Sequence, residues 1–509
     1  MEIKKHITLL LGMLVLLSAC VKESLEDTYK KYSGDREIRY IGKCTDILVQ
    51  PGWKRIIVTW KNNVDPTIKK VKVTWKLDGA KDSVLLERNT TEYNIRTLNG
   101  NPLEDGNYEI SVQGVDANNK TSIVDPVFAR PYTATHEDIM AFNRLISKTY
   151  FVKDRLILYF LEWQNSIKKA VLNYTKEDGS AGKLELTKDL IKQKYYLLED
   201  KIDPTKPLIL ERTGELQDCS DIIEFDPYEF YSDKIYEADF RQEMKRQYGY
   251  SEELPENWVN NVETLYLDWS INSFNDLLNF PNLKKLVLGS RRYLLEEAVD
   301  DSQYGQSKVS EVEASNFVLQ KLHELNGLTV ERYNKHFNQI RPAEFIEDKG
   351  NTNTIPDVEF IDLSQLTFTV YPKDPENFSS GLERLTDNDH TTNWDPRYSN
   401  EFITYELTLD LQKQKNLNGL CFVQKQYTRV GEIAIAPEYI KIKVSNDRIH
   451  WEDATYVEEN ILGKSNGEIN FIPFSENVKN STFKYIQVQI NAGFYANTYY
   501  SGAAEISLY

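Results

Sequence analysis

The sequence has few histidines and none of the short motifs on which many enzyme families depend. Only six of its 509 residues are histidine, and none lies at metal-ligand spacing from another. The chain contains no P-loop, no HExxH motif and no GxSxG motif. These absences favour a protein without catalytic activity. A glycosidase needs only two carboxylates and the chain has 78 acidic residues, so a glycan hydrolase within residues 140–345 stays an alternative.

Cysteine is scarce as well. The four cysteines, Cys20, Cys44, Cys219 and Cys421, are far apart and form no Cys-x-x-Cys pair. This spacing argues against a metal cluster and against a disulfide framework. Cys421 stands in an apolar run and is expected to be a small buried side chain. A single bridge between Cys44 and Cys219 stays open.

Positive charge is in deficit. The 61 basic residues against 78 acidic ones leave a net charge of -17. A nucleic-acid partner requires a basic face, so none is expected. The chain also lacks an apolar run long enough to cross a bilayer, because the run at residues 7–17 is too short. Lys4 and Lys5 precede that run, and together they form the pattern of a secretory signal.

The residues around the end of this signal indicate where in the cell the protein is located. Leu17-Ser-Ala-Cys20 resembles the lipobox of bacterial lipoproteins. The resemblance implies a signal peptide at residues 1–20 and a lipid on Cys20, whose acyl chains would bind the protein to the membrane. Val21-Lys-Glu23 is similar to the surface-export signal of Bacteroidota-type lipoproteins. The expected location is therefore the outer membrane, with the protein lipid-anchored and exposed at the cell surface.

Two tandem β-sandwiches are expected after a polar tether at residues 21–36. Arg55–Trp60 is strand-like, and its pattern returns 100 residues later at Arg155–Phe160. A period near 100 residues is typical of immunoglobulin-like or fibronectin-type sandwiches, here predicted at 37–131 and 140–226. Residues 34–130 also resemble an uncharacterised N-terminal domain of Bacteroidota-type lipoproteins. That resemblance rests on three segments: Gly34–Tyr40, Gly52–Arg55 and Asp65-Pro66.

The next part of the chain changes character. Leu265-Tyr-Leu267, Leu286-Val-Leu288 and Leu328-Thr-Val330 are predicted short strands, and the first two lie 21 residues apart. That period lies within the leucine-rich-repeat range. One further strand, or rung, of such a repeat would be expected between the second and third of these strands, and the polar stretch 291–317 takes its place. We expect a short leucine-rich-repeat-like α/β spacer at 227–345 and a linker at 346–359.

The last 150 residues carry the clearest pattern. Ile403, Tyr405, Leu407, Leu409 and Leu411 alternate with polar residues, which predicts a half-buried strand. Four segments then occur in a fixed order, at 385–394, 403–411, 440–451 and 484–509. Together they resemble the coagulation factor V/VIII type C, or discoidin, family, which includes the family 32 carbohydrate-binding modules. The resemblance implies a β-sandwich (a jelly roll of the galactose-binding type) at 360–509. The fold class predicted for the whole chain is therefore mainly β.

The resemblance also implies a structural Ca²⁺ site. An Asp-rich loop offers the hard oxygen ligands that Ca²⁺ prefers. The expected ligands are Asp387, Thr392 and Glu505, with Asp389 nearby. The family usually has Gly where this chain has Asn388, and Asn tolerates a left-handed turn better than most residues. A turn without metal is the alternative.

Carbohydrate contacts are expected in loops of the same domain. By resemblance to its carbohydrate-binding members, the candidates are Arg429, Asn497, Phe494 and Tyr495. His390 and Tyr427 are further candidates. Trp394 and Trp451 fit core positions and are not expected to bind sugar.

The sequence therefore predicts a non-catalytic cell-surface lipoprotein that captures glycan through its C-terminal domain. A protein-binding adhesin, or an assembly subunit of a surface complex that contacts neighbouring proteins, is the alternative. Some members of the family bind phospholipid or protein.

Overall fold

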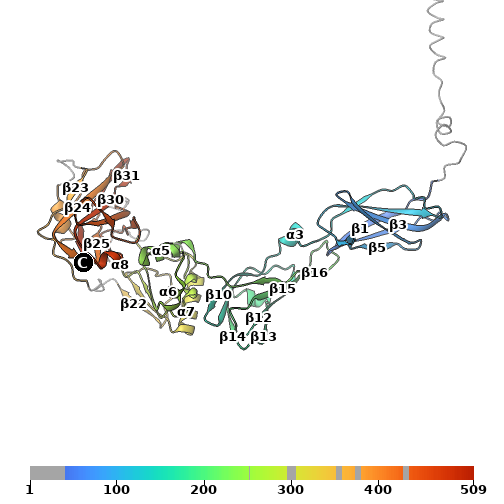
Figure 1. Ribbon diagram of the computed structural model, residues 1–509, viewed down its shortest axis with the longest axis horizontal. Helices are drawn as coiled ribbons and strands as arrows, with labels where there is room; N and C mark the ends of the chain where they lie inside the picture. The colour runs from blue at the N-terminus through green and yellow to red at the C-terminus, as the bar shows by residue number, and fades with distance from the viewer. Residues whose placement is uncertain (1–39, 252, 295–304, 351–357, 373–379, 428–434) are drawn as a thin grey trace, which may run out of the picture. The chain divides into compact units, whose positions relative to one another are not determined.

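The computed structural model describes residues 40–251, 253–294, 305–350, 358–372, 380–427 and 435–509 (Figure 1). The predicted signal peptide, Cys20 and the tether lie outside these residues. The chain forms two compact units, of which the first comprises Met1–Asn143, Gln164–Ala170 and Glu211–Pro227. The second comprises Arg144–Trp163, Val171–Leu210 and Tyr228–Tyr509. Among the described residues, no helix is long and apolar enough to cross a membrane.

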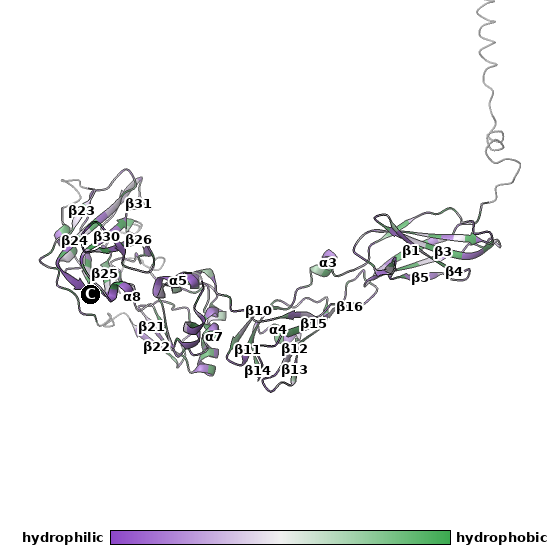
Figure 2. Ribbon diagram, viewed as in Figure 1, coloured by the Kyte–Doolittle hydropathy of each residue, from purple (hydrophilic) through white to green (hydrophobic). Residues whose placement is uncertain are grey.

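The first sandwich consists of two antiparallel sheets that enclose an apolar core. One sheet has the order β1 (Thr45–Gly52), β2 (Arg55–Lys61), β5 (Glu92–Ile95). The other has the order β4 (Ala80–Glu87), β3 (Ile68–Leu77), β8 (Tyr108–Asp116), β9 (Val127–Ala129). A small hairpin, β6 (Thr97–Leu98) and β7 (Asn101–Pro102), lies between β5 and β8 in the chain. In β2 every second side chain is buried, with Ile56, Val58 and Trp60 facing the core, as a period of two requires. Hydrophilic and hydrophobic colours accordingly mix along the strands (Figure 2).

The second sandwich repeats this plan. One sheet has the order β10 (Ile146–Val152), β11 (Arg155–Phe160), β14 (Tyr195–Lys201). The other has the order β13 (Ala181–Glu185), β12 (Ile167–Thr175), β15 (Leu208–Gly214), β16 (Ile223–Glu224), and β17 (Tyr228–Phe230) also pairs with β15. Two short helices, α3 (Glu137–Met140) and α4 (Lys188–Ile191), accompany these strands. β2 and β11 begin 100 residues apart and occupy the same place in their sheets, as the sequence period predicts.

A parallel sheet follows, with the order β18 (Thr264–Leu267), β19 (Lys285–Leu288), β21 (Thr329–Tyr333), β22 (Ile346–Gly350). The helices of this leucine-rich-repeat-like module are α5 (Ala238–Tyr248), α6 (Glu256–Asn261), α7 (Val312–Asn326) and the 3₁₀ turn η1 (Asn275–Asn279). Two expectations need correction. No middle rung is missing, because Leu286 pairs directly with Val330 across β19 and β21. The linker does not begin at 346, because residues 346–350 form the fourth strand of the sheet.

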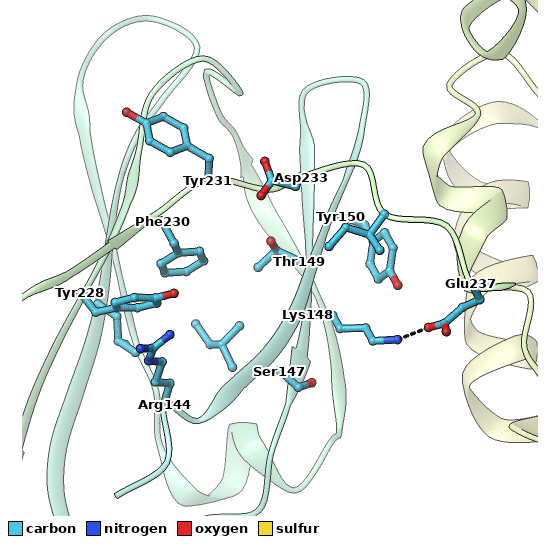
Figure 3. Close-up of a pocket in the computed structure, with 13 residues that line it drawn as sticks. Arg144, Ser147, Lys148, Thr149, Tyr150, Tyr228, Phe230, Tyr231, Asp233 and Glu237 are labelled. Atoms are coloured by element: carbon cyan, nitrogen blue, oxygen red, sulfur yellow. Dashed lines mark hydrogen bonds and ion pairs between the residues drawn. The ribbon is translucent and has the colours of Figure 1, made fainter. Parts of the chain in front are cut away.

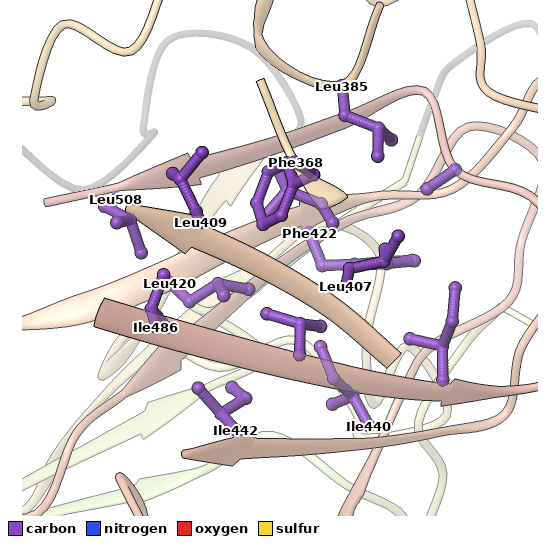
Figure 4. Packing of buried hydrophobic residues seen from close by; sticks show 14 of the residues in the cluster. Phe368, Leu385, Leu407, Leu409, Leu420, Phe422, Ile440, Ile442, Ile486 and Leu508 are labelled. Carbon is purple, nitrogen blue, oxygen red and sulfur yellow. The ribbon is translucent and has the colours of Figure 1, made fainter. Parts of the chain in front are cut away.

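The C-terminal domain is a sandwich of two antiparallel sheets. One has the order β23 (Thr369–Tyr371), β24 (Thr404–Asn416), β30 (Thr482–Asn491), β26 (Tyr439–Ser445), β27 (Glu452–Asp453), and β28 (Asn460–Ile461) also pairs with β26. The other has the order β20 (Arg292–Tyr293), β29 (Ile469–Pro473), β25 (Gly419–Val423), β33 (Glu505–Leu508). The remaining elements are the hairpin β31 (Gly493–Tyr495) and β32 (Thr498–Tyr500), the helix α8 (Glu476–Lys479) and the 3₁₀ turn η2 (Leu382–Thr386). Leu407 and Leu409 of β24 point into the core between the sheets, as their alternation predicts (Figure 4).

One strand of this domain comes from outside it. β20 lies in the polar stretch that the sequence assigned to the spacer, yet it pairs with β29. Arg292 of β20 is buried and forms an ion pair of 2.8 Å with Glu468, which is fully buried. Its other guanidinium nitrogens donate to Ser307 Oγ at 2.6 Å and to the carbonyl of Gly305 at 3.0 Å. The leucine-rich-repeat-like module therefore completes a sheet of the C-terminal sandwich and is more than a spacer.

Candidate functional site

The Asp-rich loop of the C-terminal domain follows η2 and turns sharply at Asn388. This residue has a φ of 62°, so Asn fills the left-handed position where the family usually has Gly. Asp387 accepts hydrogen bonds from the amide of Asp389 at 2.9 Å and from the hydroxyl of Thr392 at 2.8 Å. The predicted ligands Asp387 and Thr392 are thus brought into direct contact.

The late glutamate joins this loop from the other end of the domain sequence. Glu505 begins β33, is 2% exposed, and accepts a hydrogen bond of 3.2 Å from the amide of Asn388. Burial and the nearby charges of Asp387 and Asp389 raise the pKa of Glu505 to about 7. A buried carboxyl group beside like charges is costly to ionise unless a cation joins it.

The chemistry of this donor set fits Ca²⁺, because every group in it is an oxygen. Asp389 lies in the same loop, and its Oδ1 accepts hydrogen bonds from the amide and hydroxyl of Thr391, at 2.9 and 2.6 Å. Among the described residues, no three His, Cys, Asp or Glu side chains converge as a metal cluster. The side-chain oxygens would therefore come from Asp387, Thr392 and Glu505, and backbone carbonyls or water would supply the others.

The predicted sugar-binding aromatics lie on a tight hairpin. β31 and β32 pair through Phe494 and Tyr499, and the two residues between them, Ala496 and Asn497, both have left-handed φ values of 49° and 63°. Two such residues form the turn that suits the twist of a two-residue hairpin. Phe494 is 55% exposed and Tyr495 is 49% exposed. The hairpin Gly493–Tyr500, here called the aromatic hairpin, thus presents ring faces to solvent.

Further aromatic side chains extend this surface. The ring centroid of Phe402 lies 5.8 Å from that of Tyr499, and the ring centroid of Phe494 lies 4.9 Å from it. Tyr398 lies 5.9 Å from the ring of Tyr500. Phe402 and Tyr398 are both exposed, although exposed rings are normally less favourable than buried ones. Phe402 and Tyr398 were not among the residues predicted to bind sugar, and the pattern that could have indicated them is two aromatic residues in a polar stretch just before a strand.

The remaining predicted sugar contacts have different outcomes. Tyr427 is buried, and its backbone carbonyl accepts a hydrogen bond of 2.9 Å from the side chain of Asn466. The prediction that Tyr427 contacts sugar from an exposed loop is therefore wrong. His390 is exposed, and its carbonyl accepts a hydrogen bond of 3.4 Å from Gln426. Arg429 lies outside the described residues. The core prediction holds for Trp394, which is fully buried.

Three predictions about other side chains can also be compared with the structure. Trp451 is only half-buried, and its ring nitrogen donates to the carbonyl of Arg448 at 3.2 Å, so it is not a core residue. Cys44, Cys219 and Cys421 are free thiols, which removes the open alternative of a Cys44–Cys219 bridge. Cys421 is buried, as its apolar run predicts.

Comparison with known proteins gives a family match for the first part of the chain. Residues 21–218 match the model of DUF4998, described as a domain of unknown function. The match covers the first sandwich and most of the second, which agrees with the expected likeness to an uncharacterised domain. No curated protein matches the chain.

Solved structures similar to parts of the chain are β-sandwiches. The module CBM32-3 of a family 31 glycoside hydrolase from Clostridium perfringens is 20% identical, with a TM-score of 0.23, and covers 30% of this chain and 94% of its own. A fragment of a putative chitobiase from Bacteroides thetaiotaomicron is 14% identical, with a TM-score of 0.23, covering 31% and 95%. A two-domain fibronectin type-III segment of chicken tenascin is 12% identical, with a TM-score of 0.17, covering 37% and 98%. At these values none of the three indicates what the chain binds.

Proposed function

We propose that the protein is a non-catalytic surface lipoprotein that binds carbohydrate through the aromatic hairpin of its discoidin-type domain. The observation that carries the proposal is the set of exposed rings on the aromatic hairpin and beside it: Tyr398, Phe402, Phe494 and Tyr495. Aromatic faces pack against the C–H groups of a pyranose ring, and neighbouring polar groups bind its hydroxyls. Asn497 at the hairpin tip is exposed and supplies an amide for that purpose.

Calcium is proposed as a structural ion of the same domain. Asp387, Thr392 and Glu505 would hold it, and its charge would offset the ionised Glu505 that burial otherwise disfavours. The ion would fix the Asp-rich loop to β33, and so stabilise the loops of the domain that carry the predicted sugar contacts. The same residues would hold the loop together more weakly through the hydrogen bond of Asn388 when no ion is bound.

The surface location rests on the sequence alone. The lipobox-like Leu17–Cys20 and the charged residues after it support a lipid on Cys20 and display at the outer membrane. Incorporation of labelled palmitate into the full chain, compared with Cys20→Ser, tests this part. Equal labelling of both chains would contradict it.

The experiment for the binding function uses residues 21–509, which leave out the lipidated Cys20 and are here called the mature chain, rather than the discoidin-type domain alone. β20 and Arg292 belong to the completed sheet, so a domain cut at residue 355 would leave Glu468 buried without its cation. Binding to a panel of glycans is measured by calorimetry with and without Ca²⁺. A Kd between micromolar and millimolar, about -8 to -4 kcal/mol, is expected.

A matched pair of variants locates the site. Phe494→Ala combined with Tyr495→Ala is expected to weaken binding at least tenfold, because it removes two exposed ring faces. Phe128→Ala is the control, since Phe128 of β9 is also 55% exposed but belongs to the first sandwich. If no glycan binds to the folded chain, or if both variants behave alike, the proposal is wrong. A specific protein partner that survives excess free sugar would then identify an adhesin.

A further inference from the structure

A groove in the second sandwich carries a second candidate site, far along the chain from the aromatic hairpin. It opens between β10, an edge strand of its sheet, and the segment from β17 to Glu237 (Figure 3). Its volume is about 350 Å³. This lies within the range of small-ligand sites, about 300–1,000 Å³. All of its lining residues belong to the second compact unit.

One wall of this edge groove is a stack of a guanidinium group and two rings. Tyr228 and Phe230 are stacked with centroids 5.3 Å apart and planes inclined by 16°. The guanidinium carbon of Arg144 lies 3.6 Å from the centroid of Tyr228. This contact orients a planar group that is otherwise free to rotate.

Arg144 is an arginine without an acidic partner. Across the described part of the chain, no carboxylate lies within ion-pair distance of it, although the protein carries a large excess of acidic residues. The other cation of the groove, Lys148, is already neutralised by Glu237 at 2.5 Å. The guanidinium group of Arg144 is thus the cation in this groove that is both oriented and available to a ligand. A guanidinium group can bind a carboxylate through two parallel hydrogen bonds.

The groove is polarised from one end to the other. Arg144 lies at one end, and Asp233 lies at the other beyond Thr149 of β10 (Figure 3). Asp233 has no ion-pair partner among the described residues and is exposed. A ligand that fits this order has a carboxylate at one end, an apolar ring face in the middle and hydroxyl donors at the other end.

We propose that the edge groove binds a carboxylated sugar, with a hexuronate as the chemical class. The carboxylate would lie on Arg144, the C–H face of the sugar ring against the side of the Tyr228–Phe230 stack that lines the groove, and the hydroxyls on Thr149 and Asp233. A neutral sugar leaves the arginine fork unused. An acidic peptide lacks the adjacent hydroxyl groups that would donate hydrogen bonds to Asp233, and its carboxylates would be repelled by the charge of Asp233. This site is independent of the proposed glycan site on the aromatic hairpin.

The test uses the mature chain and two pairs of small probes. Digalacturonate and a glucuronate disaccharide are titrated by calorimetry, each against its methyl ester, which keeps the rings and removes the charge. The acids are expected to bind at least tenfold more tightly than the esters. Arg144→Gln should remove this preference, and Arg144→Lys should keep only part of it. An acidic tetrapeptide serves as the probe for a peptide site.

Two controls make the result specific. Arg448→Gln removes another exposed arginine that lies 4.5 Å from a tyrosine ring, Tyr485, in the C-terminal domain, and it should change nothing. Loss of Phe494 and Tyr495 should leave uronate binding intact, which separates this site from the proposed function. The inference is overturned if neither acid binds, if acid and ester bind equally, if Arg144→Gln binds like the parent, or if the tetrapeptide displaces the acids.

Discussion

The buried pair of Arg292 and Glu468 supports a quantitative prediction about how two modules are joined. Replacing Arg292 by Met keeps an unbranched apolar stem and removes the guanidinium and its charge. Glu468 is then left buried without a cation, and Ser465, whose amide donates to it at 2.9 Å, is the neighbour that stabilises its charge. Breaking a buried pair from one side costs about 3–5 kcal/mol. The loss of the bonds to Ser307 and Gly305 acts in the same direction.

The assay is equilibrium unfolding of the mature chain in urea, followed by tryptophan fluorescence. Trp269 reports on this place directly, since the Arg292 guanidinium lies 4.0 Å from its ring. Arg341→Met is the control, because its pair with Glu313 at 2.5 Å is exposed on both sides and is expected to contribute less than about 1 kcal/mol. Combining Arg292→Met with Glu468→Gln should recover most of the loss, because the uncompensated charge is gone.

The pH dependence of the single variant gives a second check. Burial raises the pKa of Glu468 above its usual range even with the arginine present. A carboxyl group with a raised folded-state pKa destabilises the fold as pH rises above its unfolded value, so the cost of Arg292→Met should be larger at pH 8 than at pH 5. The reasoning is refuted if Arg292→Met costs no more than Arg341→Met, or if the double variant is as unstable as the single one.

Three further predictions follow from other residues. Ca²⁺ should raise the thermal midpoint of the parent chain, while Glu505→Gln should abolish this rise, and an equal rise in both would contradict the proposed ligand set. Burial raises the pKa of Asp276 to about 7 from 3.8, so the folded chain loses stability as pH rises through this window. Asp276→Asn should therefore stabilise it by about 4 kcal/mol at pH 8 and hardly at pH 4, measured by urea unfolding at both values. Asn497→Val should weaken glycan binding more than Asn497→Gly, because Val at a φ of 63° costs about 1–2 kcal/mol, and equal affinities would show that the turn is not required.

The parts of the fold that the sequence predicts well are those with a local pattern. β24, β26 and β30 alternate over most of their length, and most of their buried positions are apolar, with Ser445 and Gln487 as polar exceptions. The repeat of β2 at β11 is visible for the same reason, because each strand carries its own pattern. Such patterns depend only on neighbours in the chain, so a single sequence contains them.

The corrections concern pairing between distant residues, which no local pattern encodes. β19 and β21 are neighbours across a long crossover that contains α7, and the spacing of their leucines suggested a missing strand instead. β20 has two residues, one of them a buried arginine, so neither its length nor its composition marks it as a strand. Its partner Glu468 lies 176 residues away in the chain.

The candidate site shows the same limit at the level of single side chains. Asp387 and Glu505 are brought together as the resemblance to the discoidin family implies, through the amide of Asn388. Tyr427 was expected in an exposed loop, but Asn466, 39 residues later, holds its backbone and the ring is buried. Phe402 and Tyr398 join the aromatic surface only because residues 399 and 499 pair with each other. Which of these aromatic side chains are exposed could therefore be determined only from the structure.

The way in which β20 completes the C-terminal sandwich decides which experiments on binding are informative. Without residues 291–293, β29 becomes an exposed edge that carries Phe471, and Glu468 loses its cation. An unpaired strand edge with an apolar side chain favours aggregation, and a buried unpaired carboxylate favours local unfolding. Local unfolding would begin at Glu468. The carbonyl of Glu468 accepts a hydrogen bond from the amide of Gln424, which lies next to residues 425–427, so the unfolding would reach that loop. A negative result from an isolated domain would therefore reflect the missing strand, and only the mature chain can decide between a glycan and a protein partner.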